Sequence, residues 1–361
     1  MRKLRGSAGR AGVWLLGAVL LVLAAGGVSV LRVARDGGSL ATKRPSKPQT
    51  APDFDGIHAW INSPPLTIPS LNGKVVLVDF WTYSCINCVR TLPILRALYG
   101  RYKAAGLEIV GIHAPEFKFE MDESNVRDAV RRLNVTWPVA MDNRMLTWRA
   151  YRNQYWPHVY LIDRAGVIRF DHIGEGDDVQ TELELRTLLA ERGPSSLPSP
   201  VNPSEPSFDS DMTPEIYAGY ERGEQLDTIA SAPGYSENQA VRYSAPSAST
   251  LARATTDGQI FLSGTWRSRP EFLQAETPGT IFLPFRAKNV YFVASAKESA
   301  RATLRLDGKP IGPSAGDDVK SGSATVSRSD LFWIVKLSAA GRHVLEIDAE
   351  PGFQLYTFTF G

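Results

Sequence analysis

Residues 53 to 191 alternate between buried β runs and helical segments, and this alternation limits the possible folds more than any other feature of the chain. "KVVLVDF" at residues 74 to 80 is a continuous apolar strand pattern, and the next segment, from about Ile86 to Ala104, has Leu92, Leu95 and Leu98 on one helical face. The pattern continues through "LEIVGIHA" and "ESNVRDAVRRL", and it ends with "HVYLID" and "VIRFDHIG" before a last helix. This order predicts an α/β domain with helices on both faces of a sheet.

The second half of the chain has a different texture. Residues 192 to 210, "RGPSSLPSPVNPSEPSFDS", contain five prolines and predict a linker that cannot pack. Residues 211 to 361 are short strand patterns separated by turns, and the pair Asp307-Gly308 is typical of a two-residue hairpin. We therefore expect a second domain that is an all-β sandwich.

The N-terminus is basic and then strongly apolar. Residues 1 to 10 carry four cationic side chains and no acid, and residues 11 to 31 carry no charge over twenty-one positions. About 20 apolar residues are enough to span a bilayer. The segment predicts a signal anchor, with residues 1 to 10 in the cytoplasm, residues 32 to 52 as a flexible spacer and both domains on the extracytoplasmic side of the cell membrane. A cleaved signal peptide, read at Ala24 and Ala25, stays open.

Composition excludes one class of partner. The formal net charge is only +2, and no basic stripe interleaved with aromatic residues occurs, so we expect no nucleic-acid partner.

Both cysteines of the chain, Cys85 and Cys88, lie in "WTYSCINC". As a structural staple the pair would close a loop too short to remove much unfolded-chain entropy. A zinc site needs four ligands, and the five histidines are scattered singly, so we expect no metal and no other cofactor. A reversible redox pair remains as the favoured interpretation.

The position of Cys85 fits that interpretation. It follows a buried strand and begins a helix, where unpaired N–H groups and the helix dipole favour an anion. We therefore expect the pKa of Cys85 to lie below the ordinary thiol value of about 8.5. Cys88 lies one turn further along the same helix, within reach to form a disulfide with Cys85.

The motif also carries a family resemblance. "VLVDFW", three residues and then CxxC resemble the thioredoxin superfamily, and "KVVLVDFWTYSCINCVRTLP" is similar to the membrane-anchored TlpA/ResA-type redoxins, above all to the extracytoplasmic part of DipZ proteins. "FLSGTW", "LRLDGKPI" and "HVLEIDAEPGFQLYTFTFG" resemble the C-terminal β domain of those proteins, which is of a jelly-roll or carbohydrate-binding-module type. The resemblance covers residues 53 to 361.

The resemblance implies roles for individual residues. Asp79 falls on the buried carboxylate of thioredoxin, the candidate proton acceptor for Cys88, and Pro157 falls on the family's cis-proline, which exposes the backbone of Trp156 to substrate. The predicted catalytic residues are Cys85, Cys88, Asp79 and Pro157, and the predicted substrate-binding residues are Trp81, Tyr83, Ile86, Asn87, Trp156 and Glu116. Core packing is an equal alternative for Trp81, and an ordinary surface position is the alternative for Glu116.

The implied activity is thiol–disulfide exchange, with proteins that carry disulfides as substrates. The chain departs from the family in two ways: Thr91 stands where many TlpA/ResA proteins have a glutamate, and only one hydrophobic segment is present. A separate CcdA- or DipZ-like membrane protein is therefore expected to donate electrons. Neither Ile86 nor Asn87 is cationic, so we expect a potential near the reducing end of the range from roughly −270 to −120 mV.

Two other functions stay open. "TYSC" matches the T-x-x-C pattern of peroxiredoxins, although Val78 stands where their proline is expected. Alternatively, the β domain is the functional part and binds cell-wall glycan, with a vestigial redox domain. Trp266, Phe285 and Trp333 are then the candidates to stack on sugar rings, unless they belong to the core of the sandwich.

Overall fold

The computed structural model describes residues 40–43, 49–191, 196–201, 211–247, 250–251 and 258–361. The predicted cytoplasmic head and signal anchor, residues 1 to 31, lie outside this set. Within the described ranges, no helix has the length and apolar character that crossing a bilayer requires. Residues 34 to 361 form one compact unit.

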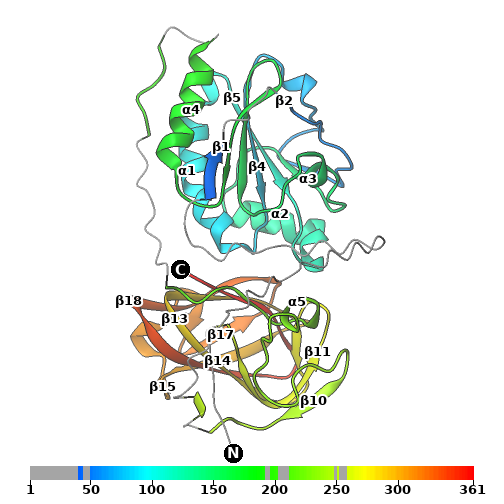
Figure 1. Ribbon diagram of the computed structural model, residues 1–361, viewed down its shortest axis with the longest axis vertical. Helices are drawn as coiled ribbons and strands as arrows, with labels where there is room; N and C mark the ends of the chain where they lie inside the picture. The colour runs from blue at the N-terminus through cyan, green and yellow to red at the C-terminus, as the bar shows by residue number, and fades with distance from the viewer. Residues whose placement is uncertain (1–39, 44–48, 192–195, 202–210, 248–249, 252–257) are drawn as a thin grey trace, which may run out of the picture. The chain divides into compact units, whose positions relative to one another are not determined.

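The N-terminal domain is built on an eight-stranded sheet (Figure 1) with the order β1-β8-β7-β4-β5-β6-β3, and β2 also pairs with β8. Its strands are β1 (Leu40–Lys43), β2 (Gln49–Thr50), β3 (Trp60–Ile61), β4 (Val75–Trp81), β5 (Leu107–His113), β6 (Val139–Met141), β7 (His158–Ile162) and β8 (Val167–Ile173). The central strand β4 pairs in parallel with β5 and antiparallel with β7. All seven residues of β4 are buried, because helices or loops cover both faces of the sheet.

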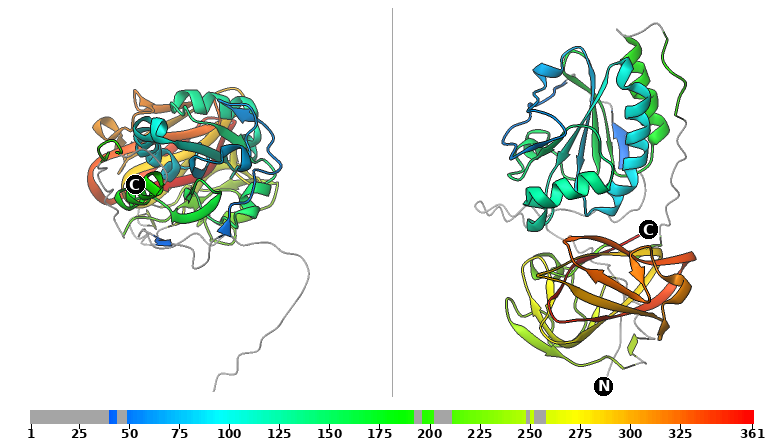
Figure 2. Two further views of the ribbon diagram at one scale, coloured as in Figure 1. Left: turned by 90° about the horizontal axis from the view of Figure 1, so that it is seen from above. Right: turned by 180° about the vertical axis from the view of Figure 1, so that it is seen from behind.

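The helices are α1 (Ile86–Tyr102), α2 (Glu123–Arg132), α3 (Leu146–Ala150) and α4 (Asp178–Glu191), with 3-10 turns at Pro69–Leu71, Lys103–Ala105 and Lys118–Met121. Apolar side chains of α1, α2 and α4 share one core with alternate residues of β4, whereas Trp148 of α3 packs in the core on the opposite face. Figures 1 and 2 show α1 and α4 side by side. The predicted α/β domain is confirmed.

Two predicted linkers contain ordered structure. Within the predicted spacer 32–52, β1 and β2 pair antiparallel with β8. An edge strand has unpaired backbone N–H and C=O groups, to which a segment of almost any sequence can hydrogen-bond. Within the supposed linker 192–210, Leu197 and Val201 pack against the core that contains α1 and α4. The prediction that the proline-rich segment cannot pack was wrong for residues 196–201, since isolated apolar side chains between prolines can still be buried.

The C-terminal domain is all β apart from one short helix, α5 (Tyr220–Gly223), and a 3-10 turn at Gly312–Ser314, as predicted. Its strands are β9 (Ile216–Tyr217), β10 (Ala240–Tyr243), β11 (Phe261–Ser268), β12 (Leu273–Ala275), β13 (Gly279–Ala296), β14 (Ala300–Leu306), β15 (Lys309–Pro310), β16 (Val319–Lys320), β17 (Ser323–Val326), β18 (Asp330–Ala349) and β19 (Phe353–Phe360). They form one hydrogen-bonded network. The two long strands β13 and β18 pair along most of their length, and their register changes near Ala287 and Val290. The Asp307-Gly308 turn joins β14 to β15, as expected.

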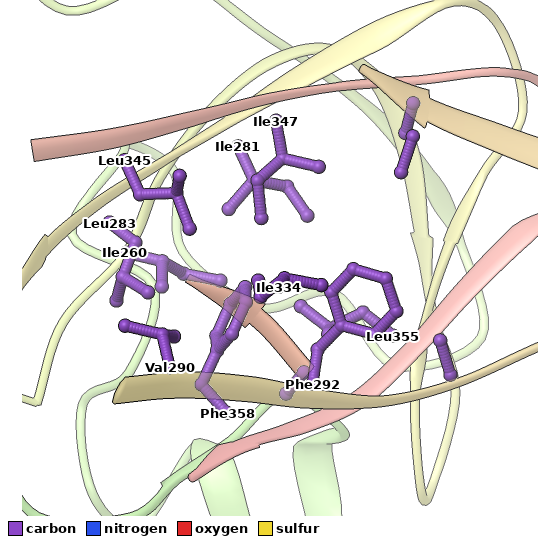
Figure 3. Close-up of a cluster of buried hydrophobic side chains, with 14 of the residues drawn as sticks. Ile260, Ile281, Leu283, Val290, Phe292, Ile334, Leu345, Ile347, Leu355 and Phe358 are labelled. Carbon is purple, nitrogen blue, oxygen red and sulfur yellow. The ribbon is translucent and has the colours of Figure 1, made fainter. Parts of the chain in front are cut away.

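One apolar core fills this domain. Figure 3 shows side chains from several strands, among them Ile281, Leu283, Phe292, Leu345 and Phe358, directed toward a common interior. The core also contains Trp266 and Phe285, each almost fully buried. These two aromatic residues therefore support the fold and are not available to stack on a sugar ring.

Candidate redox site

Cys85 caps the N-terminus of α1, at the end of the loop that follows β4. The residue has an extended backbone, and its Sγ accepts a hydrogen bond of 3.3 Å from the backbone N–H of Cys88. The two sulfurs are not bonded to each other; Cys88 is buried and Cys85 is partly exposed. The predicted arrangement, with one sulfur at the helix start and the other one turn later, is present.

The low pKa that was expected for Cys85 is not found. Burial raises the pKa of Cys85 above its ordinary value, and the carboxylates of Glu116 and Glu215 add to the rise. Hydrogen bonds from the thiol and the backbone of Cys88 act in the opposite direction but are the smaller effect. The helix start does stabilise an anion here, yet loss of water around the sulfur costs more.

Asp79 lies on β4, two residues before Trp81, so both side chains project from the same face of the sheet and into the layer that contains Cys88. Its two carboxyl oxygens are buried and have no hydrogen-bond partner among the described residues. Burial raises the pKa of Asp79 to about 7. Burial raises the pKa of Cys88 well above its ordinary value, and the charge of Asp79 adds a smaller contribution in the same direction.

The Trp156–Pro157 peptide bond is cis, as the resemblance implied. The indole Nε1–H of Trp156 donates to the carbonyl oxygen of Ala114 at 3.1 Å, and the ring packs on Trp148 with centroids 4.2 Å apart. These contacts fix the side chain of Trp156 between β5 and α3.

The other predicted substrate-binding residues differ in exposure. Trp81 is a core residue on the Cys88 side of β4, so the packing alternative holds for its side chain. Tyr83 and Ile86, on either side of Cys85, are also buried. Asn87 is exposed, and its Oδ1 accepts a hydrogen bond of 2.8 Å from Arg90.

Glu116 follows the end of β5 and is neither free nor fully exposed. Its Oε1 accepts hydrogen bonds from Tyr217 Oη at 2.9 Å and from Arg222 Nη1 at 2.8 Å. Tyr217 Oη also lies 2.8 Å from Oε2 of Glu215. Sequence patterns did not reveal Glu215, Tyr217 and Arg222. Tyr217 and Arg222 lie more than 100 residues from Glu116, and a contact over that separation leaves no local pattern.

Glu120 is a second residue that the sequence did not reveal. Its Oε1 accepts hydrogen bonds of 2.5 Å from the hydroxyls of Thr82 and Ser84. Its Oε2 accepts from the backbone N–H groups of Glu116 and Phe117 at 2.6 and 2.9 Å. This buried carboxyl therefore ties the loop directly before Cys85 to the loop after β5.

His113 ends β5 beneath this loop. Its ring stacks on Tyr83 and its Nε2 lies 3.3 Å from Thr82 Oγ1, whereas burial lowers its pKa to about 3. The imidazole is therefore neutral at physiological pH. It is a packing element of the site, as expected for a residue at a strand end.

Comparison with known proteins agrees with this geometry. Residues 48–171 match the AhpC/TSA family, and residues 213–361 match the family described as thioredoxin like C-terminal domain. Protein DipZ of Mycobacterium tuberculosis is 35% identical over 326 residues, which are 86% of this chain but 43% of DipZ. The chain thus spans less than half the length of that relative.

Two shorter relatives match the N-terminal domain. The thiol-disulfide oxidoreductase ResA of Bacillus cereus is 30% identical over 138 residues, which cover 38% of this chain and 76% of ResA. The thiol-disulfide oxidoreductase YkuV of Bacillus subtilis is 25% identical over 143 residues, which cover 40% of this chain and 96% of YkuV. By its cysteine pair, its fold and these relatives, the chain belongs to the ResA-type family of thioredoxin-like thiol-disulfide oxidoreductases.

Proposed function

We propose that this chain is a membrane-anchored, extracytoplasmic enzyme that reduces protein disulfides with the pair Cys85 and Cys88. The observation that carries the proposal is the placement of the two sulfurs. Sγ of Cys85 lies at the start of α1 and is hydrogen-bonded by Cys88, the thiol that would resolve a mixed disulfide.

The exchange proceeds in two steps. The Cys85 thiolate attacks a substrate disulfide, which forms a mixed disulfide and releases one substrate thiolate. Cys88, once deprotonated, attacks Cys85, so that the Cys85–Cys88 disulfide forms and the second substrate thiolate leaves. Two electrons pass to the substrate, and the two protons of the cysteine thiols end on the substrate thiols.

Asp79 is the proposed acceptor for the proton of Cys88. A carboxyl with a pKa of about 7 holds a proton part of the time at neutral pH and can therefore take up or return one. No other described residue hydrogen-bonds to its oxygens, so the carboxyl is free to bond to the thiol or to a water molecule.

Substrate binding is proposed at the surface around Cys85. The backbone next to the cis bond of Pro157 would pair with an extended substrate segment, as in the addition of a short strand. Trp156, Tyr83, Ile86 and Asn87 are the proposed contacts of such a segment, and Glu116 and Trp81 are proposed to support them.

The proposal also covers the location of the chain in the cell and the source of its electrons. The apolar run 11–31 would anchor the chain and leave both domains outside the cytoplasm. Each cycle leaves the pair oxidised, so a separate CcdA- or DipZ-like membrane protein would return the electrons.

Reduction of insulin by the dithiol form tests the activity. Wild type should reduce insulin, Cys85→Ser should be inactive, and Cys88→Ser should accumulate a mixed disulfide through Cys85, because the resolving thiol is missing. Mixed disulfides captured with Cys88→Ser in cells would identify substrates. An insulin rate equal to that of Cys85→Ser would refute the proposal.

The match to the AhpC/TSA family keeps a thiol peroxidase as the second candidate. The reduced protein should then consume hydrogen peroxide faster than it reduces insulin. We favour disulfide exchange because the partner thiol is only three residues away on the same helix.

A further inference from the structure

Four side chains near Cys85 join the two domains. We call them the clasp: Glu116 of the N-terminal domain, and Glu215, Tyr217 and Arg222 of the C-terminal domain. Glu116 Oε1 accepts hydrogen bonds from Tyr217 and Arg222, and the Tyr217 hydroxyl bridges Glu116 and Glu215. Tyr83, two residues before Cys85, contacts Ser329 of the C-terminal domain, and the carboxylates of Glu116 and Glu215 both raise the pKa of Cys85.

Arg222 balances the charge of the clasp. Its guanidinium pairs with Glu116 and lies over the ring of Tyr217, 3.7 Å from the centroid. Burial, with a smaller contribution from the charge on Glu116, raises the pKa of Glu215 to about 7. Without the cation, two carboxylates joined through a single hydroxyl would repel each other across the domain boundary.

Contacts around the clasp hold the same two surfaces together. Tyr83 Oη donates to the carbonyl oxygen of Ser329 at 3.3 Å, and Arg132 pairs with the buried Asp330 at 2.6 Å. Phe117 of the N-terminal domain packs with Tyr217, Val293 and Tyr356 in a small buried cluster.

Residues next to Cys85 in the chain are buried. Tyr83, before the cysteine, is 1% exposed, and Ile86, the first residue of α1, is 6% exposed. Cys85 itself is only partly exposed, and Asn87 is open to solvent. Access to the sulfur is therefore restricted, and part of its surroundings, at Tyr83, is bonded to Ser329 of the C-terminal domain.

We propose that the C-terminal domain determines substrate specificity: the closed clasp favours small disulfides at Cys85, and its transient opening admits protein disulfides, so that wild type reduces insulin slowly. Arg222 and Tyr217 are then specificity-determining residues. This inference rests on the proposed exchange activity, and it gives the second domain a role at the redox site itself.

Two variants weaken the clasp without altering the cysteines. Arg222→Gln removes the cation and keeps most of the side-chain bulk, and Tyr217→Phe removes only the bridging hydroxyl. Arg305→Gln is the matched control, because Arg305 pairs with Glu346 and Asp348 within the C-terminal domain. The assay compares the reduction rates of insulin and of a small aromatic disulfide.

Arg222→Gln should raise the ratio of the insulin rate to the small-disulfide rate by about tenfold, since loss of one charge-assisted hydrogen bond shifts a two-state equilibrium by roughly that factor. Tyr217→Phe should raise it less, and Arg305→Gln should leave it unchanged. An unchanged ratio in both clasp variants overturns the inference. So does a slower insulin reaction, because the domain would then be a docking surface for substrates.

A second measurement does not depend on turnover. In reduced protein, a polymer-coupled maleimide should label Cys85 faster in Arg222→Gln than in wild type, while labelling by iodoacetamide changes little. Equal polymer labelling rates contradict the inference. If labelling follows the expectation but wild type reduces no disulfide, the exchange activity fails and the covering of Cys85 stands.

Discussion

Oε1 of Glu116 accepts a 2.8 Å hydrogen bond from the guanidinium of Arg222, which lies 106 residues further along the chain. This pair joins the domain that carries the cysteines to the domain that follows it. It lies near enough to Cys85 for the carboxylate of Glu116 to affect that thiol. Charged groups of both domains, Glu116 and Glu215, thus contribute to the pKa of Cys85.

The first prediction concerns the ionisation of Cys85. Burial raises its pKa above the ordinary value, whereas an ordinary thiol with a pKa of about 8.5 is roughly 3% ionised at pH 7. Alkylation of Cys85 by iodoacetamide in Cys88→Ser should therefore be slower at pH 7 than that of a free cysteine peptide. The rate should still be rising above pH 9.

Mass spectrometry of the peptide that contains Cys85 measures this rate, and Cys85→Ser supplies the background. A rate that levels off below pH 8 would show that the helix start, and not burial, controls the sulfur.

The second prediction concerns Asp79 and the pH dependence of stability. Its pKa is raised from 3.8 to about 7 in the folded protein, so the unfolded chain releases this proton first as the pH rises. Burial of the Asp79 charge therefore lowers the free energy of unfolding. This contribution is absent below pH 3.8, grows between pH 4 and 7, and is constant above pH 7. At about 1.36 kcal/mol per pKa unit, it reaches on the order of 4 kcal/mol.

Asp79→Asn should therefore increase the free energy of unfolding by a few kcal/mol at pH 8 and by little at pH 4, because the amide carries no charge to bury. Urea unfolding at the two pH values measures the difference. The same variant should slow the release of the mixed disulfide by Cys88. Equal stabilisation at both pH values would contradict the assigned pKa.

The third prediction concerns Glu120, which binds four donors with its two oxygens. In Glu120→Gln, the amide NH2 group can donate to the two hydroxyl oxygens, but these hydroxyls then lose the acceptor for their own hydrogens. The variant should be less stable by about 1–3 kcal/mol at pH 5. It should lose less stability at pH 8, because burial raises the pKa of Glu120 to about 7 and the wild-type carboxylate is then costly to bury.

Glu191→Gln is the control, because Glu191 is exposed and its ion pair among the described residues is with Arg169 on the surface. Because Glu120 holds Ser84, the residue before Cys85, Glu120→Gln should also change the pH profile of Cys85 alkylation. A loss of stability with an unchanged profile would limit Glu120 to a structural role.

The fourth prediction concerns the glycan hypothesis. Trp266 is buried in the C-terminal core, and its Nε1–H donates to the carbonyl oxygen of Ser263 at 2.8 Å. Trp266→Ala should cost about 3–5 kcal/mol of stability, as expected for truncation of a buried aromatic residue.

Trp333→Ala is the comparison, since Trp333 is only partly buried and lies beside Tyr291 and Lys336. It should cost less stability, and of the three aromatic candidates only Trp333 remains able to contact a ligand. Glycan binding that is lost in a folded Trp266→Ala protein and kept in Trp333→Ala would contradict this interpretation.

Local patterns were sufficient for much of the fold. The apolar run at 74–80 became β4, the leucine spacing after Cys85 became α1, and the Asp307-Gly308 pair became a hairpin turn, because each depends on residues close together in the chain. The cysteine pair was predicted from the same kind of local pattern, and Asp79 from the resemblance of that segment to thioredoxin.

Tertiary structure decided what surrounds those residues. Three features bring together groups whose spacing in the sequence has no regular period. They are the burial of Cys85, the four hydrogen bonds of Glu120 and the pairing of Glu116 with Arg222. The ionisation of a thiol depends on the water and charge around it. The sequence therefore located the reactive sulfur, whereas tertiary packing around it set its pKa and its exposure.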